Sequence, residues 1–303
     1  MGLDINALYL LIQARKTSLS FHKVLTLGVQ EVNVYEKPLR RVLQRAGFDL
    51  LDEDVSPSPS GMVSARRVLR SLGADEVITL DASSYEGAQI IHNLNTPISR
   101  ELEGQFDLVF DGGTLEHVFN IPVAIANCMK AIRIGGGFIS ITPANNCFGH
   151  GFYQLGADFY WRALSIENGF RTDCVAVHGI GPYNRWYRVP DPRKLQQRTE
   201  LISFRPMAVF ALAVRVAERD IFSAWPQQTS YNENDYDRMR RTLNRSSARR
   251  GALRIHRSLP SVARFLHVAR MAFLFYSRQS LWNRRVFIPL RKELCLDGKL
   301  LAS

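Results

Sequence analysis

The chain has 303 residues, of which 46% are hydrophobic and 22% are charged, a composition typical of a globular protein that buries a core. No stretch reaches the roughly 18 consecutive apolar residues that a membrane span requires, and the first residues lack the basic leading region of a secretory signal. The four cysteines form no CxxC pair, so the sequence indicates neither a zinc site nor a disulfide framework, and it favours the reducing cytoplasm.

The formal net charge of +11 is concentrated near the C-terminus. Residues 238–303 contain 16 Arg and Lys against two acids, whereas residues 1–237 contain 23 bases and 26 acids. A nearly neutral body with a basic tail predicts a negatively charged partner for the tail, and says little about the fold.

Along the chain, segments with helical spacing of apolar residues alternate with short apolar runs rich in strand formers. This alternation predicts an α/β fold, with a Rossmann-like, doubly wound, mostly parallel sheet and helices on both faces. The run 208–217 fits either a strand or a buried helix. The expected helices are 3–15, 38–46, 64–72, 118–129 and 158–168, and the expected strands lie within 21–27, 76–81, 86–95, 106–111 and 138–142.

We expect three regions: an N-terminal helix packing on the domain (1–20), a main α/β domain (21–230) and a basic, amphipathic helical tail (231–303). Within the tail, the apolar run 265–276 is interrupted by His267 and is too short to span a bilayer, but it suits a helix lying in a membrane interface. Three interpretations of the tail remain open: a solvated helical face, an anionic membrane surface bound through residues 238–303, and nucleic acid. Arginines that alternate with Leu, Phe and Trp favour the membrane.

The chain is organised around the stretch 105–118. The short apolar strand Phe106–Phe110 is followed at once by Asp111-Gly112-Gly113 and then by a helical pattern. The three glycines 135–137 stop that helix before the next strand, so the stretch predicts a βαβ unit of a parallel sheet. Ligands of such sheets bind beyond the carboxyl ends of the strands, which makes Asp111 to His117 the expected place for chemistry.

Five segments resemble, in their order, the motifs of class I S-adenosylmethionine (SAM)-dependent methyltransferases. The resemblance spans about 21 to 217, and it implies a Rossmann-like fold, SAM as cofactor and methyl transfer as the reaction. Residues 149–153 and 225–228 further resemble a subgroup associated with glycan and cell-surface biosynthesis. The five segments are 24–28 (VLTLG), 77–81 (VITLD), 106–111 (FDLVFD), 113–118 (GTLEHV) and 132–139 (IRIGGGFI).

The resemblance implies a set of cofactor-binding residues at the strand ends. The loop at Leu27 and Gly28 would approach the methionine part of SAM, Asp81 would accept hydrogen bonds from the ribose hydroxyls, and Asn93 would face the adenine amino group. Each also has a simpler interpretation as a turn residue. The chain departs from the family pattern at 29–31, where Val-Gln-Glu replaces the usual glycines. The remaining residues assigned to the methionine part are Asp111, Gly112 and Gly113.

Glu116, His117 and His150 are the candidate catalytic residues. An imidazole titrates near pH 6.5 and can take a proton from a hydroxyl at cellular pH, so His117 is the first candidate base and His150 the second. His117 could instead cap or pack at a helix start, and the glycines beside His150 suggest an exposed loop. A His–Glu pair could hold a divalent ion, but no third ligand stands at a diagnostic spacing, so we expect no metal site.

Together these features predict a SAM-dependent methyltransferase that modifies an oxygen, such as a hydroxyl of a sugar or glycan precursor. It would act in the cytoplasm or at the inner face of the membrane. Two alternatives stay open: a non-catalytic scaffold of the same fold, in which the altered glycine loop no longer binds SAM, and a nucleic-acid methyltransferase that uses its basic tail. The sequence does not predict the oligomeric state.

Overall fold

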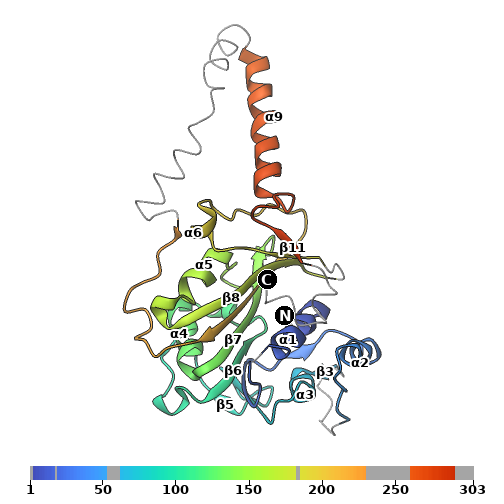
Figure 1. Ribbon diagram of the computed structural model, residues 1–303, viewed down its shortest axis with the longest axis vertical. Coiled ribbons are helices and arrows are strands. Elements are labelled where there is room, and N and C mark those ends of the chain that lie inside the picture. Colours follow the sequence, from blue (N-terminus) through green and yellow to red (C-terminus); the bar gives the residue numbers. More distant parts are fainter. Residues whose placement is uncertain (1–2, 18, 53–61, 182–184, 230–259, 291–303) are drawn as a thin grey trace.

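A nine-stranded sheet forms the centre of the protein (Figure 1). The computed structural model describes residues 3–17, 19–52, 62–181, 185–229 and 260–290. The strands of the sheet lie in the order β11-β9-β8-β10-β7-β6-β1-β4-β5, and β2 and β3 form a separate pair. The strands are β1 (Lys23–Leu27), β2 (Glu31–Val32), β3 (Val63–Ser64), β4 (Glu76–Asp81), β5 (Ile90–Ile91), β6 (Phe106–Asp111), β7 (Ile132–Asn145), β8 (Phe170–Gly179), β9 (Trp186–Arg188), β10 (Met207–Arg215) and β11 (Ile288–Leu290).

Half of this sheet has the doubly wound order that the sequence predicts. β1 lies between β4 and β6, all three are parallel, and β5 and β7 extend the parallel arrangement on either side. The chain therefore winds outward from β1 in both directions, as in Rossmann-like folds. Beyond β7 every pairing is antiparallel, because β9 and β10 run against the other strands. The sheet is thus mixed, and the prediction of a mostly parallel sheet was too strong.

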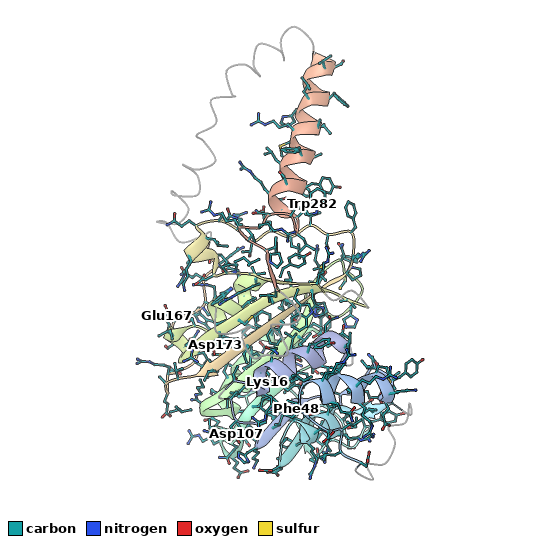
Figure 2. The ribbon with its side chains drawn as sticks, turned by 45° about the vertical axis from the view of Figure 1, so that its right-hand side comes forward. Lys16, Phe48, Asp107, Glu167, Asp173 and Trp282 are labelled. Atoms are coloured by element: carbon teal, nitrogen blue, oxygen red, sulfur yellow. The ribbon has the colours of Figure 1, made fainter. Side chains whose placement is uncertain are left out.

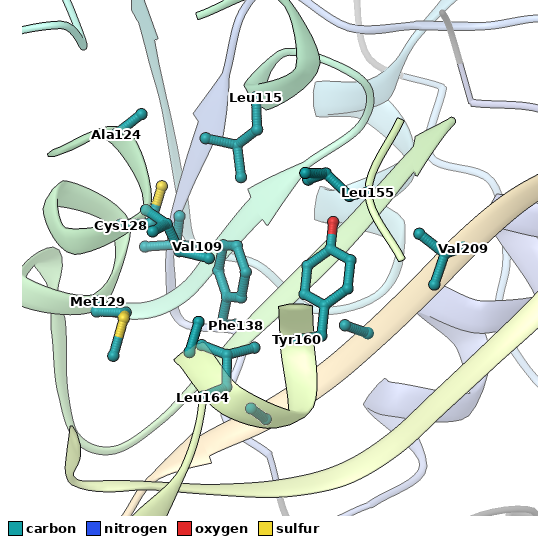
Figure 3. Close-up of a cluster of buried hydrophobic side chains, with 14 of the residues drawn as sticks. Val109, Leu115, Ala124, Cys128, Met129, Phe138, Leu155, Tyr160, Leu164 and Val209 are labelled. Carbon is teal, nitrogen blue, oxygen red and sulfur yellow. The ribbon is translucent and has the colours of Figure 1, made fainter. Parts of the chain in front are cut away.

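Helices cover both faces of the sheet, which confirms that part of the prediction. Along β6, Val109 packs into the core with α4 and α5, whereas Leu108 and Phe110 pack into the core with α1, α2 and α3. This alternation follows from the pleat of a strand. Figure 3 shows the first core around Phe138 and Tyr160. The helices are α1 (Ile5–Arg15), α2 (Glu36–Arg45), α3 (Ala65–Ser71), α4 (Ile121–Ala131), α5 (Ala157–Ala163), α6 (Pro192–Leu195) and α9 (Pro260–Gln279), with 3₁₀ turns η1 (Arg100–Leu102), η2 (Leu115–His117) and η3 (Ile166–Asn168).

The N-terminal helix α1 is buried around most of its surface, including the polar residues Asn6 and Gln13. Asn6 Oδ1 accepts a hydrogen bond from Trp186 Nε1 at 2.9 Å, which ties α1 to β9. The helix therefore lies inside the fold, and its sequence lacks the polar face that a surface helix would show.

The glycines at 135–137 do not stop a helix before a strand, as we expected, but lie inside β7, which begins at Ile132. A Cβ at Gly136 would lie 2.8 Å from the Asp107 carbonyl oxygen, and one at Gly137 would lie 2.6 Å from Leu19. These glycines allow close packing along the strand. The ambiguous run 208–217 proves to be a strand, β10.

The tail contributes one long helix and one edge strand among the described residues. α9 projects from the body of the protein (Figure 1), and its chain returns so that β11 pairs with β9. Val286 and Phe287 are buried in the core that α4 and α5 cover. Across the part of the chain that the structure describes, no helix has both the length and the apolar character needed to cross a membrane. The other tail residues, 231–259 and 291–303, lie outside the described residues, and the domain boundaries stay a prediction.

Candidate cofactor and acceptor site

The candidate site lies where β1, β4 and β6 end at one edge of the sheet. In the ladders of β1, Leu27 stands opposite Leu80 on one side and Asp111 on the other. Gly28 follows β1, Asp81 is the last residue of β4, and Gly112 follows β6. The fold therefore brings the predicted residues of all three strands together at the carboxyl edge.

Gly28 and Asp81 form one side of this edge. Gly28 has a φ of +71°, and its N–H donates to the Leu80 carbonyl oxygen at 2.8 Å. A Cβ at Gly28 would lie 3.0 Å from Thr114 Oγ1, 3.3 Å from Gln30 Nε2 and 3.7 Å from Asp81 Oδ2, so these side chains surround Gly28 closely and leave little room for a side chain there. Asp81 Oδ1 accepts from the Ser83 N–H at 2.9 Å, and Oδ2 accepts no hydrogen bond from the described residues. One carboxylate oxygen therefore remains available to a ligand.

The Gln30 side chain covers both Gly28 and Gly112, a placement that the sequence did not reveal. Its side-chain amide donates to the Leu27 carbonyl oxygen at 2.8 Å. A Cβ at Gly112 would lie only 2.7 Å from Gln30 Oε1, so the glutamine fills the space above that glycine. The departure from the family glycines at this point was visible in the sequence. The direction of the side chain, back over Leu27 and Gly112, depends on the fold.

Asp111 holds the turn that follows β6. Its side chain is fully buried, and Oδ1 accepts from the N–H groups of Gly113, Thr114 and Leu115 at 2.9–3.3 Å. Oδ2 accepts from Ser140 Oγ at 2.7 Å. Burial raises the pKa of this carboxyl, and the hydrogen-bond donors oppose the rise. Both oxygens have protein partners, so Asp111 shapes the turn, and its contact with a cofactor stays a prediction.

Asn93 lies in an exposed turn after β5. Its Oδ1 accepts from both the main-chain N–H and the side-chain amide of Asn95, at 3.0 and 2.8 Å. Asn95 in turn accepts from the Asn120 N–H at 2.8 Å. The side-chain oxygen of Asn93 therefore accepts hydrogen bonds from within its own loop in this structure. Its proposed contact with adenine stays a prediction.

The three candidate catalytic side chains form one cluster. Glu116 and His117 lie in η2, and His150 comes from the loop after β7. Glu116 Oε1 lies 3.5 Å from His150 Nε2 and 3.8 Å from His117 Nε2, and the two imidazole rings are 5.0 Å apart in an edge-to-face arrangement. From spacing alone we expected no third donor beside the Glu116–His117 pair, and the fold supplies His150.

The acid and the imidazoles of this cluster titrate away from their usual ranges. Burial, together with the charge of Asp111, raises the pKa of Glu116 to about 8. Burial lowers the pKa of His117, with a further contribution from His150, and burial also lowers the pKa of His150. Both imidazoles are therefore neutral at neutral pH, and each has a nitrogen lone pair that can accept a proton or bind a ligand.

Gly151 explains why His150 reaches Glu116. Gly151 has a φ of +76°, and a Cβ there would lie 2.8 Å from the Glu116 carbonyl oxygen. The same carbonyl oxygen accepts from the Phe152 N–H at 2.7 Å. The loop therefore packs directly on η2. The glycines around His150 had suggested an exposed loop, but one of them is present for close approach.

Exposed aromatic rings border the cluster. Phe119 and Phe152 are 70% and 66% exposed, and their rings lie 5.6 Å apart. Tyr153 Oη donates to the Phe119 carbonyl oxygen at 2.7 Å, which joins the two loops that carry these rings. An exposed apolar surface beside a polar cluster is a typical feature of a ligand site.

A pocket of about 1240 Å³ lies at the base of α9. Figure 2 shows Trp282 in this region, below the helix. The pocket adjoins the loop that carries His150, because Ser203, which lines it, receives a hydrogen bond from Asn146. Its apolar lining comes mainly from Ile202, Phe204, Met207, Ala272, Phe273, Tyr276, Leu281, Trp282 and Leu290.

Comparisons with known proteins find only remote similarity. No protein-family model and no curated protein matches the chain. Among solved structures, a presumed methyltransferase from Bacillus halodurans is 9% identical, with 69% of this chain and 99% of that chain covered and a TM-score of 0.41. The 1,6-didemethyltoxoflavin N1-methyltransferase of Burkholderia thailandensis, solved with S-adenosylhomocysteine, is 12% identical, with 70% and 80% covered and a TM-score of 0.36. A SAM-dependent methyltransferase from Aquifex aeolicus is 9% identical, with 67% and 88% covered and a TM-score of 0.34. The function is therefore inferred from the residues of the site.

Two glycines flank His150, and we predict that they differ in their tolerance of a side chain. Gly151→Ala should lower the free energy of unfolding by about 2–4 kcal/mol, because alanine strains a positive φ and overlaps Glu116. Gly149→Ala is the matched control, since a Cβ there meets nothing within 4 Å. Urea unfolding of both variants measures the difference, and equal stabilities would contradict the packing of this loop on η2.

Proposed function

We propose that the protein is a SAM-dependent methyltransferase that modifies a hydroxyl oxygen. The observation that carries the proposal is the position of two features at one edge of the sheet. The available carboxylate oxygen of Asp81 lies beside Gly28, and the Asp111 turn that closes this space continues directly into Glu116 and His117. A cofactor-binding edge and a proton-accepting cluster are thus joined by a few residues.

The residues at the strand ends fit SAM on the side of Asp81. The carboxylate would accept hydrogen bonds from the ribose hydroxyls, and the ligand could approach the main chain at Gly28 once the Gln30 amide, which lies over this glycine too, moves away. On the side of Gly112, the space is filled by Gln30, whose side chain must turn away or contact the ligand. When bound, SAM supplies an activated methyl group, and the protein supplies orientation and a proton acceptor.

Within the cluster, His117 is the first candidate for the proton acceptor. It is the more exposed of the two histidines, and its lowered pKa keeps the imidazole neutral and able to accept a proton. The Glu116 carboxyl group, 3.8 Å from His117 Nε2, and the His150 ring would restrict the orientation of the His117 ring by packing beside it. The cluster would then take the proton of an acceptor hydroxyl.

The surroundings of the cluster support a sugar as the acceptor. The exposed rings of Phe119 and Phe152 offer flat apolar faces on which a sugar ring can stack, beside groups that can take a hydroxyl proton. The apolar pocket at the base of α9 adjoins the same loop and has the character of a site for a lipid chain. A lipid-linked glycan precursor would use both features.

α9 supports action near an anionic membrane. The helix carries no acidic residue, and it exposes large apolar side chains together with Arg270 and Arg278. Such helices bind membrane interfaces through apolar burial and through attraction to anionic lipids. The exposed apolar residues of α9 are Val262, Phe265, Leu266, Val268, Met271, Phe273, Phe275 and Tyr276.

A second candidate function, a scaffold that binds no SAM, is favoured by one observation. The Gln30 side chain fills the space above Gly112, and its hydrogen bond to Leu27 holds it there. If this side chain does not move, the methionine part of SAM has no place at the edge. The two functions differ in the outcome of cofactor titrations.

We predict that the protein binds S-adenosylhomocysteine and that Asp81→Ala weakens binding at least tenfold. The substitution removes the carboxylate, so the ribose hydroxyls would lose two hydrogen bonds. Such charge-assisted bonds contribute about 1.5–3 kcal/mol each. Glu76→Ala is the matched control, because Glu76 lies on the same strand at its opposite end. Calorimetric titration measures all three proteins. No binding by the wild type, or equal binding by all three, would favour the scaffold.

Removing the Gln30 side chain should strengthen binding of the same ligand. Gln30→Ala frees the space above Gly112 and removes the need to break a hydrogen bond worth about 1 kcal/mol, so we expect an affinity about fivefold higher. Gln105→Ala, an exposed glutamine ahead of β6, serves as the control. Weaker binding by Gln30→Ala would instead assign Gln30 as a ligand contact.

For the membrane, we predict that the full-length protein cosediments with vesicles containing phosphatidylglycerol and less so with pure phosphatidylcholine. The double variant Phe265→Ser/Val268→Ser should reduce recovery at least tenfold, since each apolar side chain contributes roughly 1.5 kcal/mol or more when buried. Tyr35→Ser/Ile166→Ser changes two exposed residues of the body as a control. Equal recovery of all proteins with both vesicles would rule out this role of α9.

A further inference from the structure

Glu116 is a buried acid between two histidines. Its side chain is completely buried, and neither carboxylate oxygen has a hydrogen-bond partner among the described residues. Buried polar atoms nearly always have such partners, and an unpartnered buried carboxylate carries a large desolvation cost. Oε1 faces two imidazole nitrogens, at 3.5 and 3.8 Å, which is too long for a hydrogen bond.

The two histidines complete a set of three donor atoms. One atom from each of Glu116, His117 and His150 lies within 4.8 Å of the other two. His150 Nε2 is also buried without a hydrogen-bond partner. The Glu116 Oε1 atom and the His150 Nε2 atom, neither with a hydrogen-bond partner among the described residues, face each other 3.5 Å apart, a spacing that leaves room for a cation bound to both.

We propose that Glu116, His117 and His150 bind a divalent transition-metal ion. Two imidazoles and one carboxylate on one side of an ion are a donor set suited to Zn²⁺, Mn²⁺ or Fe²⁺ and leave positions open for further ligands. Because His117 and His150 are both partly exposed, further ligands could reach an ion held by these residues from solvent.

The packing of Gly151 on Glu116 supports this assignment. Gly151 lies close to both the carbonyl oxygen and Cγ of Glu116, and it fixes the loop so that His150 points at the carboxylate. The site is therefore formed by two separate segments, η2 and the loop after β7, which pack directly on each other.

The role of the ion rests on the proposed function. An acceptor hydroxyl bound at an open position would lose its proton to water more readily, because a bound cation stabilises the oxyanion. With the ion present, His117 is a ligand, and the ion takes over the activation otherwise assigned to its imidazole. The binding of the ion itself does not depend on SAM.

The test is titration of the metal-free, full-length protein with Zn²⁺ by calorimetry and with Co²⁺ by visible absorption. We expect one tightly bound equivalent, and at least tenfold weaker binding in each of Glu116→Gln, His117→Ala and His150→Ala. His22→Ala is the control, because His22 and Asp75 form an exposed histidine–acid pair elsewhere on the surface. Zn²⁺ should also raise the melting temperature of the wild type and the control, and not that of the other variants.

The metal site is overturned if the wild type binds no ion tightly, or if all three variants bind as the wild type does. His117→Ala keeps the test valid if a buried substitution impairs folding, since His117 is half exposed. The same preparations are titrated with S-adenosylhomocysteine. If the protein binds S-adenosylhomocysteine but no metal ion, the metal site is overturned and the proposed function stands. If it binds the metal ion but not S-adenosylhomocysteine, the metal site stands and the proposed function is overturned.

Discussion

The buried carboxylate of Asp111 is the constraint on which the site depends. Four donors converge on it, three from the turn after β6 and one from β7. A hydrogen bond of this kind contributes about 1 kcal/mol. These bonds fix the turn in which Thr114 reaches back to the Leu27 carbonyl oxygen at 2.8 Å, and they fix the start of η2. The edge with Asp81 and the cluster with Glu116 therefore keep one geometry relative to each other.

The same turn links two groups of side chains. On one side, Gly28 and Gly112 have no side chain, and the Gln30 side chain occupies the space above both. On the other side, Glu116 is buried while its two histidine neighbours reach the surface. A ligand held at the first part and an acceptor held at the second would meet across the turn, as an in-line transfer requires.

Much of the parallel half of the sheet could be predicted from the sequence, because Phe106–Asp111 and Glu76–Asp81 are buried strands that end in acids. The direction of β10 could not be predicted, because the apolar sequence pattern of a buried strand does not depend on whether the strand runs parallel or antiparallel to its neighbours. β9 and β11 are only three residues long and carry little pattern. At the site, Glu116 and His117 could be selected as candidates from the sequence because they come directly after a buried strand. The contact with His150 could not be predicted, because it depends on Gly151 packing against a carbonyl oxygen that is distant in sequence.

A crystal structure of the protein grown with S-adenosylhomocysteine tests the proposed cofactor site. We predict that the ribose hydroxyls lie within hydrogen-bond distance of Asp81 and that the homocysteine part lies over Gly112, with the Gln30 side chain turned away from Leu27. A structure in which Gln30 still donates to Leu27 and no ligand occupies the edge, although the ligand was present in large excess, would contradict the proposed site.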